Sequence, residues 1–446
     1  MSSRIGIVGG GALGMTLALR LREQGHDVVV LEGARAPGGL AASQQIGGYT
    51  WDRFYHVILQ SDSELVGLLR ELGLDDRLHW SVTRTGFYTD GVLYSLSTSL
   101  EFLMFPPLSL IDKMRLAGTI MYASRVRDWK KLEKIPVATW LERLSGKRTF
   151  ERIWLPLLKS KLGENYRIAS AAFIWAIIAR MYAARRSGLK REMFGYVDGG
   201  YATVLARFEN YLEEKQIEVR TGAQVTGVRD IGSEAEISFA DGSTTRFDRV
   251  ILTVPASRIP ALCPQLSTAE QERLGLVVYQ GVLCASMLIK KPLATYYVTN
   301  ITDGWVPFTG VIEMTTLVDK ERFGGNSLVY LPRYLAQDDP FWKATDDEVR
   351  ETFLAAIEKM YPAFTRDDVL EFRIARARDV LAISTLDYSA AALPAARTSL
   401  ANVFVVNSAQ IASGTLNLNE TVGLANRQAA TLAPLLESRE PAVAHV

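Results

Sequence analysis

Cysteine and histidine are scarce in this sequence. Among its 446 residues there are 2 cysteines and 4 histidines. Cys263 and Cys284 do not form a C-x-x-C pair, and no group of side chains in the sequence has the spacing of metal ligands. We therefore expect no dithiol redox centre and no metal site. Because few cysteines are typical of proteins from a reducing compartment, we also expect a cytoplasmic location.

The sequence also lacks long apolar runs, a leader and internal repeats. One apolar run, residues 168–179, is followed by Arg180 and falls short of the ~18 residues that a membrane-spanning helix needs. Because the first predicted strand begins at residue 4, we expect no signal peptide. There is no P-loop and no Ser-His-Asp arrangement. With 48% hydrophobic and 22% charged residues, this length predicts a globular chain of two interwoven domains.

Glycine, by contrast, occurs in a spacing that predicts a nucleotide site. Residues Arg4–Val8 have the pattern of a short buried strand, and a helical pattern follows Gly9-x-Gly11-x-x-Gly14. The first glycine allows a tight turn, the second lets a pyrophosphate approach the backbone, and the third lets helix and strand pack closely. A second strand ends in Glu32, whose carboxylate can bind ribose hydroxyls and would repel a 2′-phosphate. This order of features predicts a Rossmann-type domain.

The segment after Glu32 contains more than a plain nicotinamide-binding fold requires. In "EGARAPGGLAAS", residues 32–43, Arg35 precedes the adjacent glycines Gly38 and Gly39. This stretch resembles the motif with which the flavin-containing amine oxidoreductase superfamily wraps the diphosphate of FAD. Leu40 stands where many amine oxidases have arginine, and "GGLA" is more similar to the mutase and desaturase branches. The resemblance implies FAD as the cofactor.

Two further blocks resemble the same superfamily. Residues 195–229 contain a double glycine, a helix and a strand, which implies that Val225 meets the adenine side, and residues 247–259 look like the strand that returns to the Rossmann sheet. Near the C-terminus, residues 402–430 resemble the segment that closes on the flavin. Asn407-Ser408 replaces the usual Gly-Asp there, which weakens the case for a carboxylate on the ribityl chain. A helix beginning at Asn419-Glu420-Thr421 could still direct its amides at a reduced flavin.

The motif and the resemblance together define the expected cofactor site and fold. The expected FAD-binding residues are Gly9, Gly11, Ala12, Leu13, Gly14, Glu32, Arg35, Gly38, Gly39, Leu40, Val225, Asn419, Glu420 and Thr421. The expected fold class is α/β, with a GR2-like Rossmann-type FAD domain interwoven with a substrate domain of antiparallel sheet plus a helical insertion. The FAD domain takes residues 1–95, 196–260 and 385–446, the helical insertion takes 96–195, and the substrate sheet and helices take 261–384.

Three residues are candidates for a role in catalysis. His56 follows the FAD motif in a segment that resembles the one bringing a histidine to the flavin face in UDP-galactopyranose mutases, although a structural histidine is the favoured interpretation. Tyr330 and Arg333 lie in the predicted substrate domain, where they could bind a phosphate or a planar substrate. The alternative is that these polar residues only cap the end of a strand and bind no substrate. This interpretation is slightly favoured.

The helical insertion carries a strong positive charge. Residues 100–195 contain 19 lysines and arginines and 8 aspartates and glutamates, beside helices rich in large apolar residues. One interpretation is a peripheral membrane contact through residues 100–190, with Phe102, Phe105 and Trp175 facing the bilayer and basic side chains meeting anionic headgroups. A channel for an anionic amphiphile is another, and ordinary helix packing is a third. We expect no nucleic-acid partner, because no recognised module accompanies the charge.

Three functions fit these observations. The first is an FAD-dependent oxidase or desaturase that moves hydride from a substrate carbon to flavin N5 and acts on a hydrophobic substrate, such as an isoprenoid, a polyketide or a lipid-linked molecule. The second is a non-redox enzyme similar to UDP-galactopyranose mutase, acting on a nucleotide sugar or a lipid-linked sugar. The third is an FAD-stabilised binding protein without turnover. The first is favoured.

Overall fold

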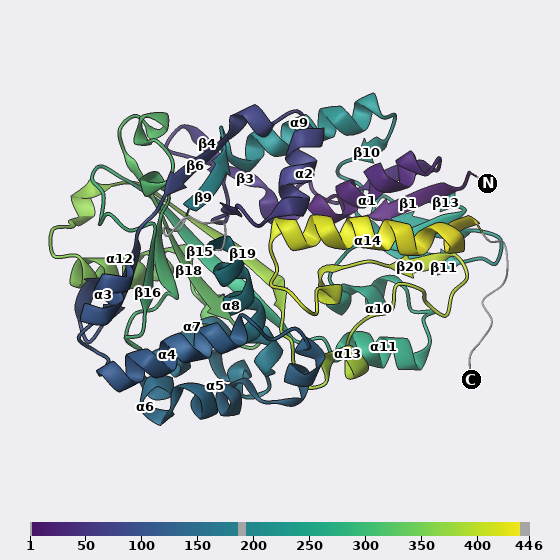
Figure 1. Ribbon diagram of the computed structural model, residues 1–446. Coiled ribbons are helices and arrows are strands. Elements are labelled where there is room, and N and C mark those ends of the chain that lie inside the picture. Colours follow the sequence, from purple (N-terminus) through teal and green to yellow (C-terminus); the bar gives the residue numbers. More distant parts are fainter. Residues whose placement is uncertain (1, 186–192, 438–446) are drawn as a thin grey trace.

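A five-stranded parallel sheet forms the centre of one half of the molecule. The computed structural model describes residues 2–185 and 193–437 (Figure 1). The strand order across the sheet is β10 (Glu218–Arg220), β2 (Asp27–Leu31), β1 (Arg4–Val8), β14 (Arg249–Leu252) and β20 (Val403–Val405), with all pairings parallel. Strands from three distant parts of the sequence therefore meet in one sheet, and their carboxyl ends share one edge.

Both faces of this sheet are covered. Ile5, Ile7 and Val28 face a core shared with helices, while Val8 and Val29 face a second core on the opposite side, as the two-residue period of strands requires. The first core contains α1 (Ala12–Glu23), α2 (Ser63–Glu71), α9 (Gly200–Glu214) and α14 (Leu418–Glu437). The second contains the small antiparallel sheet β11 (Val225–Asp230), β12 (Ala235–Phe239) and β13 (Thr244–Phe247), with α10 (Ile259–Leu262), α11 (Thr268–Gly275) and α13 (Tyr388–Ala391).

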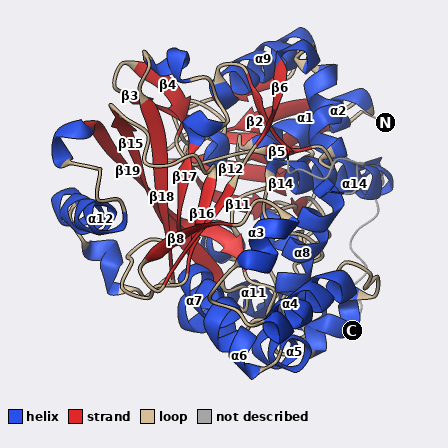
Figure 2. Ribbon diagram, turned by 60° about the vertical axis from the view of Figure 1, so that its left-hand side comes forward, coloured by secondary structure: helices blue, strands red, loops and turns tan. Residues whose placement is uncertain are grey.

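A seven-stranded sheet dominates the other half (Figure 2). Its order is β19 (Val369–Ala382), β15 (Tyr279–Ile289), β18 (Ser327–Leu335), β17 (Gly310–Glu313), β16 (Val298–Ile301), β7 (Thr85–Thr89) and β8 (Val92–Ser95). All pairings are antiparallel except that of β16 with β7. One face packs on α12 (Asp346–Met360), and the other faces residues 40–59. We refer to this second face as the inner face of the sheet.

Shorter strands connect the two halves. A hairpin follows the predicted FAD motif, and a three-stranded sheet lies beside it (Figure 1). The hairpin strands are β3 (Ser43–Ile46) and β4 (Tyr49–Asp52), and the sheet has the order β5 (Ile58–Leu59), β9 (Met193–Val197) and β6 (Leu78–Val82). Gln44 of the hairpin donates to Ser286 of β15, so the chain passes directly from the parallel sheet to the inner face of the antiparallel one.

The helical insertion packs around its own core. Its helices are α3 (Ser99–Met104), α4 (Leu110–Ala123), α5 (Val137–Ser145), α6 (Lys147–Thr149), α7 (Leu155–Leu162) and α8 (Ala171–Arg185). Phe105 and Trp175 are 2% and 9% exposed within this core, and Phe102 is half-buried. The expectation that Phe105 and Trp175 face a bilayer is therefore wrong: Phe105 packs edge-to-face on Phe87 and Tyr94, and the neighbours of Trp175 on α8 are buried as well.

The predicted fold class is confirmed: an α/β nucleotide-binding domain is interwoven with an antiparallel sheet and a helical insertion. Two details differ from the predicted ranges. β7 and β8 fall within residues 1–95 but belong to the seven-stranded sheet, where β7 pairs with β16. α11 falls within residues 261–384 but packs against the parallel sheet. Tertiary pairing decides both placements.

Candidate cofactor and substrate site

The glycine loop between β1 and α1 is shaped by close backbone contacts. Gly9 has φ +116°, a conformation that favours glycine. A Cβ on Gly14 would lie 2.0 Å from the carbonyl oxygen of Gly9, so only glycine lets α1 begin so near the strand. Gly11 is the N-cap residue of α1 and provides no side-chain cap, and the first turn contains no acidic residue. Ala12 and Leu13 follow in that turn. A helix N-terminus of this kind attracts an anion such as a diphosphate.

The second pair of glycines lies directly against this loop. Gly38 donates its N–H to the Gly10 carbonyl at 2.8 Å and forms a bridge with Gly11. Gly38 and Gly39 have φ +123° and +57°, and a Cβ built on Gly11 meets nothing nearer than the Gly39 Cα at 4.0 Å. Side-chain-free backbone from two separate segments thus forms a cradle for a group with close backbone contacts. Arg35, on the connecting segment, is exposed.

Glu32 braces the same loop. Its carboxylate accepts hydrogen bonds from the N–H of Gly10 at 2.7 Å and from that of Ala34 at 2.8 Å. The Glu32 carbonyl accepts from Ala223, two residues before Val225, the first residue of β11. The structure therefore brings Glu32 and the start of β11 together, whereas Leu40 packs with the inner face of the seven-stranded sheet.

Thr253 is a further residue of the cradle that the sequence patterns did not single out. It follows β14, at the shared carboxyl edge of the parallel sheet. Its hydroxyl donates to the carbonyl oxygens of Val8 at 2.9 Å and Gly9 at 3.1 Å. These hydrogen bonds fix the start of the glycine turn to the end of β14. The available signal was its position directly after a strand predicted to return to the Rossmann sheet.

The start of α14 differs from the expected arrangement. Asn419 Oδ1 accepts from the N–H groups of Glu64 and Leu65, so this side chain caps α2 and does not face a cofactor. The N–H of Glu420 donates to Asn417 Oδ1, and Thr421 bonds the Asn417 carbonyl. Burial raises the pKa of the Glu420 carboxyl. The N–H groups of Glu420 and Thr421 are therefore used within the helix, so the expected role of the helix start toward a reduced flavin is left to the first N–H groups, that of Asn419 among them.

A polar cluster lies where the hairpin meets α9. Asp52 is 3% exposed and accepts the N–H of Tyr201 at 2.7 Å, while its carbonyl accepts the Tyr330 hydroxyl at 2.6 Å. His56 Nδ1 is 3.8 Å from Asp52 Oδ2 and has no hydrogen-bond partner, and the ring packs edge-to-face on Tyr201 with centroids 4.9 Å apart. Asp52 therefore ties together the hairpin, α9 and β18 and lies beside the histidine.

The structure does not bring Tyr330 and Arg333 together. Tyr330 is fully buried on the inner face of the sheet, and burial raises the pKa of its phenol well above the usual value. Arg333 lies on the opposite face, where its guanidinium is 4.0 Å from the centroid of Phe341 and donates to the Pro307 carbonyl. The expectation that both bind one substrate is wrong, since residues three apart on a strand point to opposite faces.

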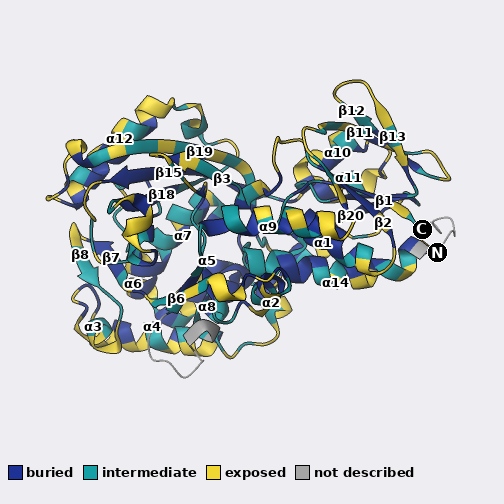
Figure 3. Ribbon diagram, turned by 90° about the horizontal axis from the view of Figure 1, so that it is seen from above, coloured by how far each residue is buried: buried dark blue, intermediate teal, exposed yellow. Residues whose placement is uncertain are grey.

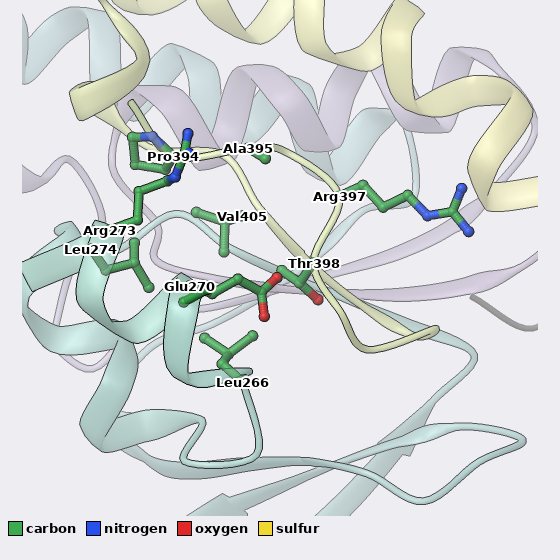
Figure 4. A pocket seen from close by; sticks show the side chains of 10 residues that line it. Leu266, Glu270, Arg273, Leu274, Pro394, Ala395, Arg397, Thr398 and Val405 are labelled. Atoms are coloured by element: carbon green, nitrogen blue, oxygen red, sulfur yellow. The ribbon is translucent and has the colours of Figure 1, made fainter. Parts of the chain in front are cut away.

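A pocket of about 270 Å³ lies elsewhere, between α11 and residues 394–398 (Figure 4). Val405 of the edge strand β20 lines it, and no lining residue belongs to the glycine loop or to the second glycine pair. Glu270, the acidic residue in the pocket, is bonded to Ser267 and Ser399. This pocket is therefore not part of the candidate site.

Comparison with known proteins places these features in a wider group. A model of the family described as flavin containing amine oxidoreductase matches residues 14–412. Coproporphyrinogen III oxidase of Mycobacterium bovis is 26% identical over 280 residues, which cover 57% of this chain and 60% of that protein. The chain thus aligns with about three fifths of the length of this curated relative.

Solved structures share the fold over nearly the whole chain. A provisionally named protoporphyrinogen oxidase from Exiguobacterium sp. 255-15 has a TM-score of 0.77 and 18% identity, covering 97% of this chain and 99% of that one. Putrescine oxidase bound to putrescine has a TM-score of 0.75 and 18% identity, with the same coverage. At these identities the likeness shows the fold.

Proposed function

Because the chain belongs to the flavin-containing amine oxidoreductase family, we propose that it is an oxidase or desaturase acting on a hydrophobic small molecule. In this proposal the protein is an FAD-dependent oxidoreductase, which its membership of the family supports. The position of the glycine cradle most strongly supports a hydrophobic substrate. Leu40, directly after the second glycine pair, packs with the inner face of the seven-stranded sheet, and the helical insertion beside that sheet has an apolar core. Apolar surroundings of this kind suit an apolar substrate.

The residues of the cradle fit FAD. The uncapped N-terminus of α1 and the bare backbone of Gly11 and Gly39 suit a diphosphate. Glu32, which already accepts two backbone N–H groups, has the charge to accept ribose hydroxyls, and Val225, the first residue of β11, would lie on the adenine side. FAD, when bound, supplies a flavin that accepts hydride from a substrate carbon.

His56 is our candidate for a residue that faces the flavin. It lies on the segment between the cradle and the inner face, and Asp52 is the residue that would position it. A change of Asp52 to asparagine keeps the acceptor for the Tyr201 N–H but removes the charge beside the imidazole. We expect this variant to fold, to bind FAD and to shift the pH profile of flavin reduction. An unchanged profile would assign Asp52 a structural role alone.

The test of the proposed reaction uses the protein purified with its FAD. Under anaerobic conditions, fractions of an apolar cell extract are added while the visible absorption band of the flavin is followed. The proposal predicts that at least one fraction bleaches the band and that oxygen or a quinone restores it. If no fraction bleaches it, and a fraction is converted only after dithionite reduces the flavin, the enzyme uses its cofactor without net redox change and the proposal fails.

We also propose a peripheral membrane contact, located on α3 and α4. No helix among the described residues is long and apolar enough to cross a bilayer. However, large apolar side chains on these two helices are between 48% and 71% exposed (Figure 3): Leu100, Leu103, Met104, Leu110, Ile111, Met114, Met121 and Tyr122. The Lys113 ammonium donates to the Leu103 carbonyl at 2.6 Å, so the end of α3 and the start of α4 are adjacent. We call these eight side chains the apolar patch.

Basic side chains flank the apolar patch. Arg125 bonds the Met121 carbonyl, Arg148 lies 3.5 Å from Asp112, and Arg115 lies beside Gly146. Apolar side chains between exposed cations match an anionic lipid surface, where each basic residue contributes about 1 kcal/mol. This chemistry supports a bilayer as the partner.

The membrane proposal predicts co-sedimentation with vesicles that contain phosphatidylglycerol. Binding should weaken as salt shortens the Debye length from about 10 Å to about 3 Å. Ile111→Ser with Met114→Ser should reduce it strongly, because both side chains are more than half exposed. Leu276→Ser, an exposed leucine outside the patch, is the control and should bind as wild type. Complete recovery in the supernatant at low salt would refute the contact.

A further inference from the structure

Helix α7 is fixed across one end of the seven-stranded sheet. The Thr309 hydroxyl donates to the Ser160 carbonyl at 2.8 Å, and the Thr309 N–H donates to Pro332 of β18. The C-terminal turn of α7 is thereby held over the part of β18 that contains Tyr334. Lys161, in that turn, is the residue that the structure directs at the sheet.

Lys161 is a cation without an acidic partner. Its Nζ is 3.5 Å from the Tyr334 hydroxyl and 4.5 Å from the centroid of the Tyr334 ring. Among the side chains that the structure describes, none with a carboxylate forms an ion pair with this nitrogen within 4.0 Å. The side chain is only half-exposed. A partly desolvated ammonium that meets a single hydroxyl and a ring face has unused hydrogen-bonding capacity, since it offers three donors.

Gln280 provides a second, independent observation. It is 0% exposed, and its Oε1 accepts from Asn165 Nδ2 at 3.1 Å, while its Nε2 has no partner. Val282 of β15 pairs with Tyr334 of β18, and Gln280 precedes Val282 by two residues, next to a shift in the pairing with β19. The alternation of side chains along β15 directs Gln280 to the side of Tyr334, diagonally across the two strands. A buried amide donor without a partner destabilises the fold, because it has lost its hydrogen bonds to water. A ligand that accepts this hydrogen bond would remove that destabilisation.

Tyr55 completes the group from the cofactor side. Its hydroxyl is 3.1 Å from the Tyr334 hydroxyl, and burial raises the pKa of its phenol well above the usual value, so it stays protonated. Tyr55 immediately precedes His56, and it packs with Leu40 and Tyr334 in one cluster. We call Lys161, Gln280, Tyr334 and Tyr55 the donor cluster. It combines one net positive charge with hydroxyl and amide donors, beside an apolar surface.

We propose that the donor cluster binds an oxyanionic group, a carboxylate or a phosphate monoester, at one end of an otherwise apolar substrate. This inference rests on the proposed function, because it names the chemical class of substrate for the same site. The Lys161 ammonium and the Gln280 amide would each donate to an anionic oxygen, with Tyr334 between them. An amine substrate would instead place a cation beside Lys161, which is unfavourable.

The test uses the FAD-loaded protein and simple probes with the same alkyl chain. Decanoate, decyl phosphate and decylamine are titrated by isothermal calorimetry, with the flavin absorption spectrum as a second readout. Decanoate, decyl phosphate or both should bind, and decylamine should bind at least tenfold more weakly. Lys161→Met should weaken anion binding by about tenfold or more, because hydrogen bonds to charged groups are worth about 1.5–3 kcal/mol. Lys161→Arg should restore most of it.

Lys159 provides the matched control. It lies two residues away on α7 and is exposed, with its ammonium over the ring of Tyr166 and not near Tyr334. Lys159→Met removes the same charge from the same helix and should change anion binding by less than about twofold. The inference is overturned if decylamine binds as well as decanoate, or if Lys161→Met binds anions like wild type.

The outcomes separate this inference from the proposed function. If FAD is bound and bleached by a substrate, but the anionic probes bind independently of Lys161, the donor cluster only holds α7 on the sheet. If the anionic probes bind through Lys161 but no substrate bleaches the flavin, the oxyanion site stands and the redox proposal fails.

Discussion

Gly11→Ala separates cofactor binding from folding more cleanly than any other substitution in the cradle. Gly11 has φ −72° and ψ 175°, a conformation that alanine adopts without strain. The nearest protein atom to an added Cβ is the Gly39 Cα at 4.0 Å, which is ordinary contact. The protein itself therefore has room for the methyl group. The group that the methyl would meet is the diphosphate that the cradle is proposed to hold.

Two opposing magnitudes follow from this geometry. Without FAD, the alanine variant should be as stable as wild type or more stable by about 0.4–1 kcal/mol, because alanine restricts the unfolded chain. With FAD, the methyl overpacks the contact, which costs typically about 1–3 kcal/mol of binding free energy. Gly11→Val, with a larger branched side chain, should retain no FAD.

The assay is the FAD dependence of thermal unfolding together with the FAD content of the purified protein. At a ligand concentration of 100 times Kd, wild type gains about 2.7 kcal/mol, and the alanine variant should lose most of that gain while its cofactor-free Tm is preserved. Gly14→Ala is the contrasting control: its Cβ would lie 2.0 Å from the Gly9 carbonyl oxygen, so it should destabilise the fold with or without FAD. If both Gly11 variants purify with full FAD, the diphosphate does not lie against this loop.

Further predictions concern charge and covalent chemistry. Glu32→Ala should weaken FAD binding by about 1.5–3 kcal/mol and also lower the cofactor-free Tm, because the carboxylate accepts the Gly10 N–H; an unchanged Tm would contradict the bracing role. Burial raises the pKa of Glu313 to about 7, above its unfolded value, so wild type loses stability as pH rises through this range. Glu313→Gln removes the charge but keeps only one of the two oxygens that accept the N–H groups of Leu293 and Ala294. Its free energy of unfolding should therefore vary less than that of wild type between a pH of about 4 and about 8, as denaturant titrations can check. Acid precipitation should release free FAD, because Cys263 and Cys284 are buried and neither belongs to the glycine loop or the second glycine pair; yellow precipitated protein would refute this.

The Rossmann part of the fold was predictable because its signals are local. The spacing of Gly9, Gly11 and Gly14 specifies backbone geometry within a few residues, and the structure has the strand, turn and helix in that order. The contact between Gly38 and Gly11 depends on distant segments, and it was accessible only through resemblance to a family.

Other placements needed information that local patterns do not contain. Asn419 caps α2, a helix more than 340 residues earlier in the chain, so its local position at a helix start was misleading. Phe105 and Trp175 could not be distinguished from Leu110 or Met114 by hydrophobicity, because α4 and its neighbours are apolar on both faces. In each case, contacts with residues distant in the sequence determine where the side chain lies.

The sequence could have corrected one wrong prediction, but it could not have predicted the juxtaposition of Lys161 and Gln280. Tyr330 and Arg333 are an odd number of residues apart, and the alternation of side chains along a strand already places them on opposite faces. By contrast, nothing in the sequence connects Lys161 with Gln280. That juxtaposition arises from the packing of α7 on the sheet and from the pairing of β15 with β18.

The central claim is that this chain oxidises an organic substrate with an FAD held along the glycine cradle. Its most direct test is an anaerobic single turnover of the FAD-loaded protein with the apolar extract fraction, followed by mass spectrometry and flavin absorbance. The account predicts one equivalent of bleached flavin for each substrate molecule converted, and a product lighter by two hydrogens. A product of unchanged mass, formed only when the flavin has been reduced beforehand, would contradict it.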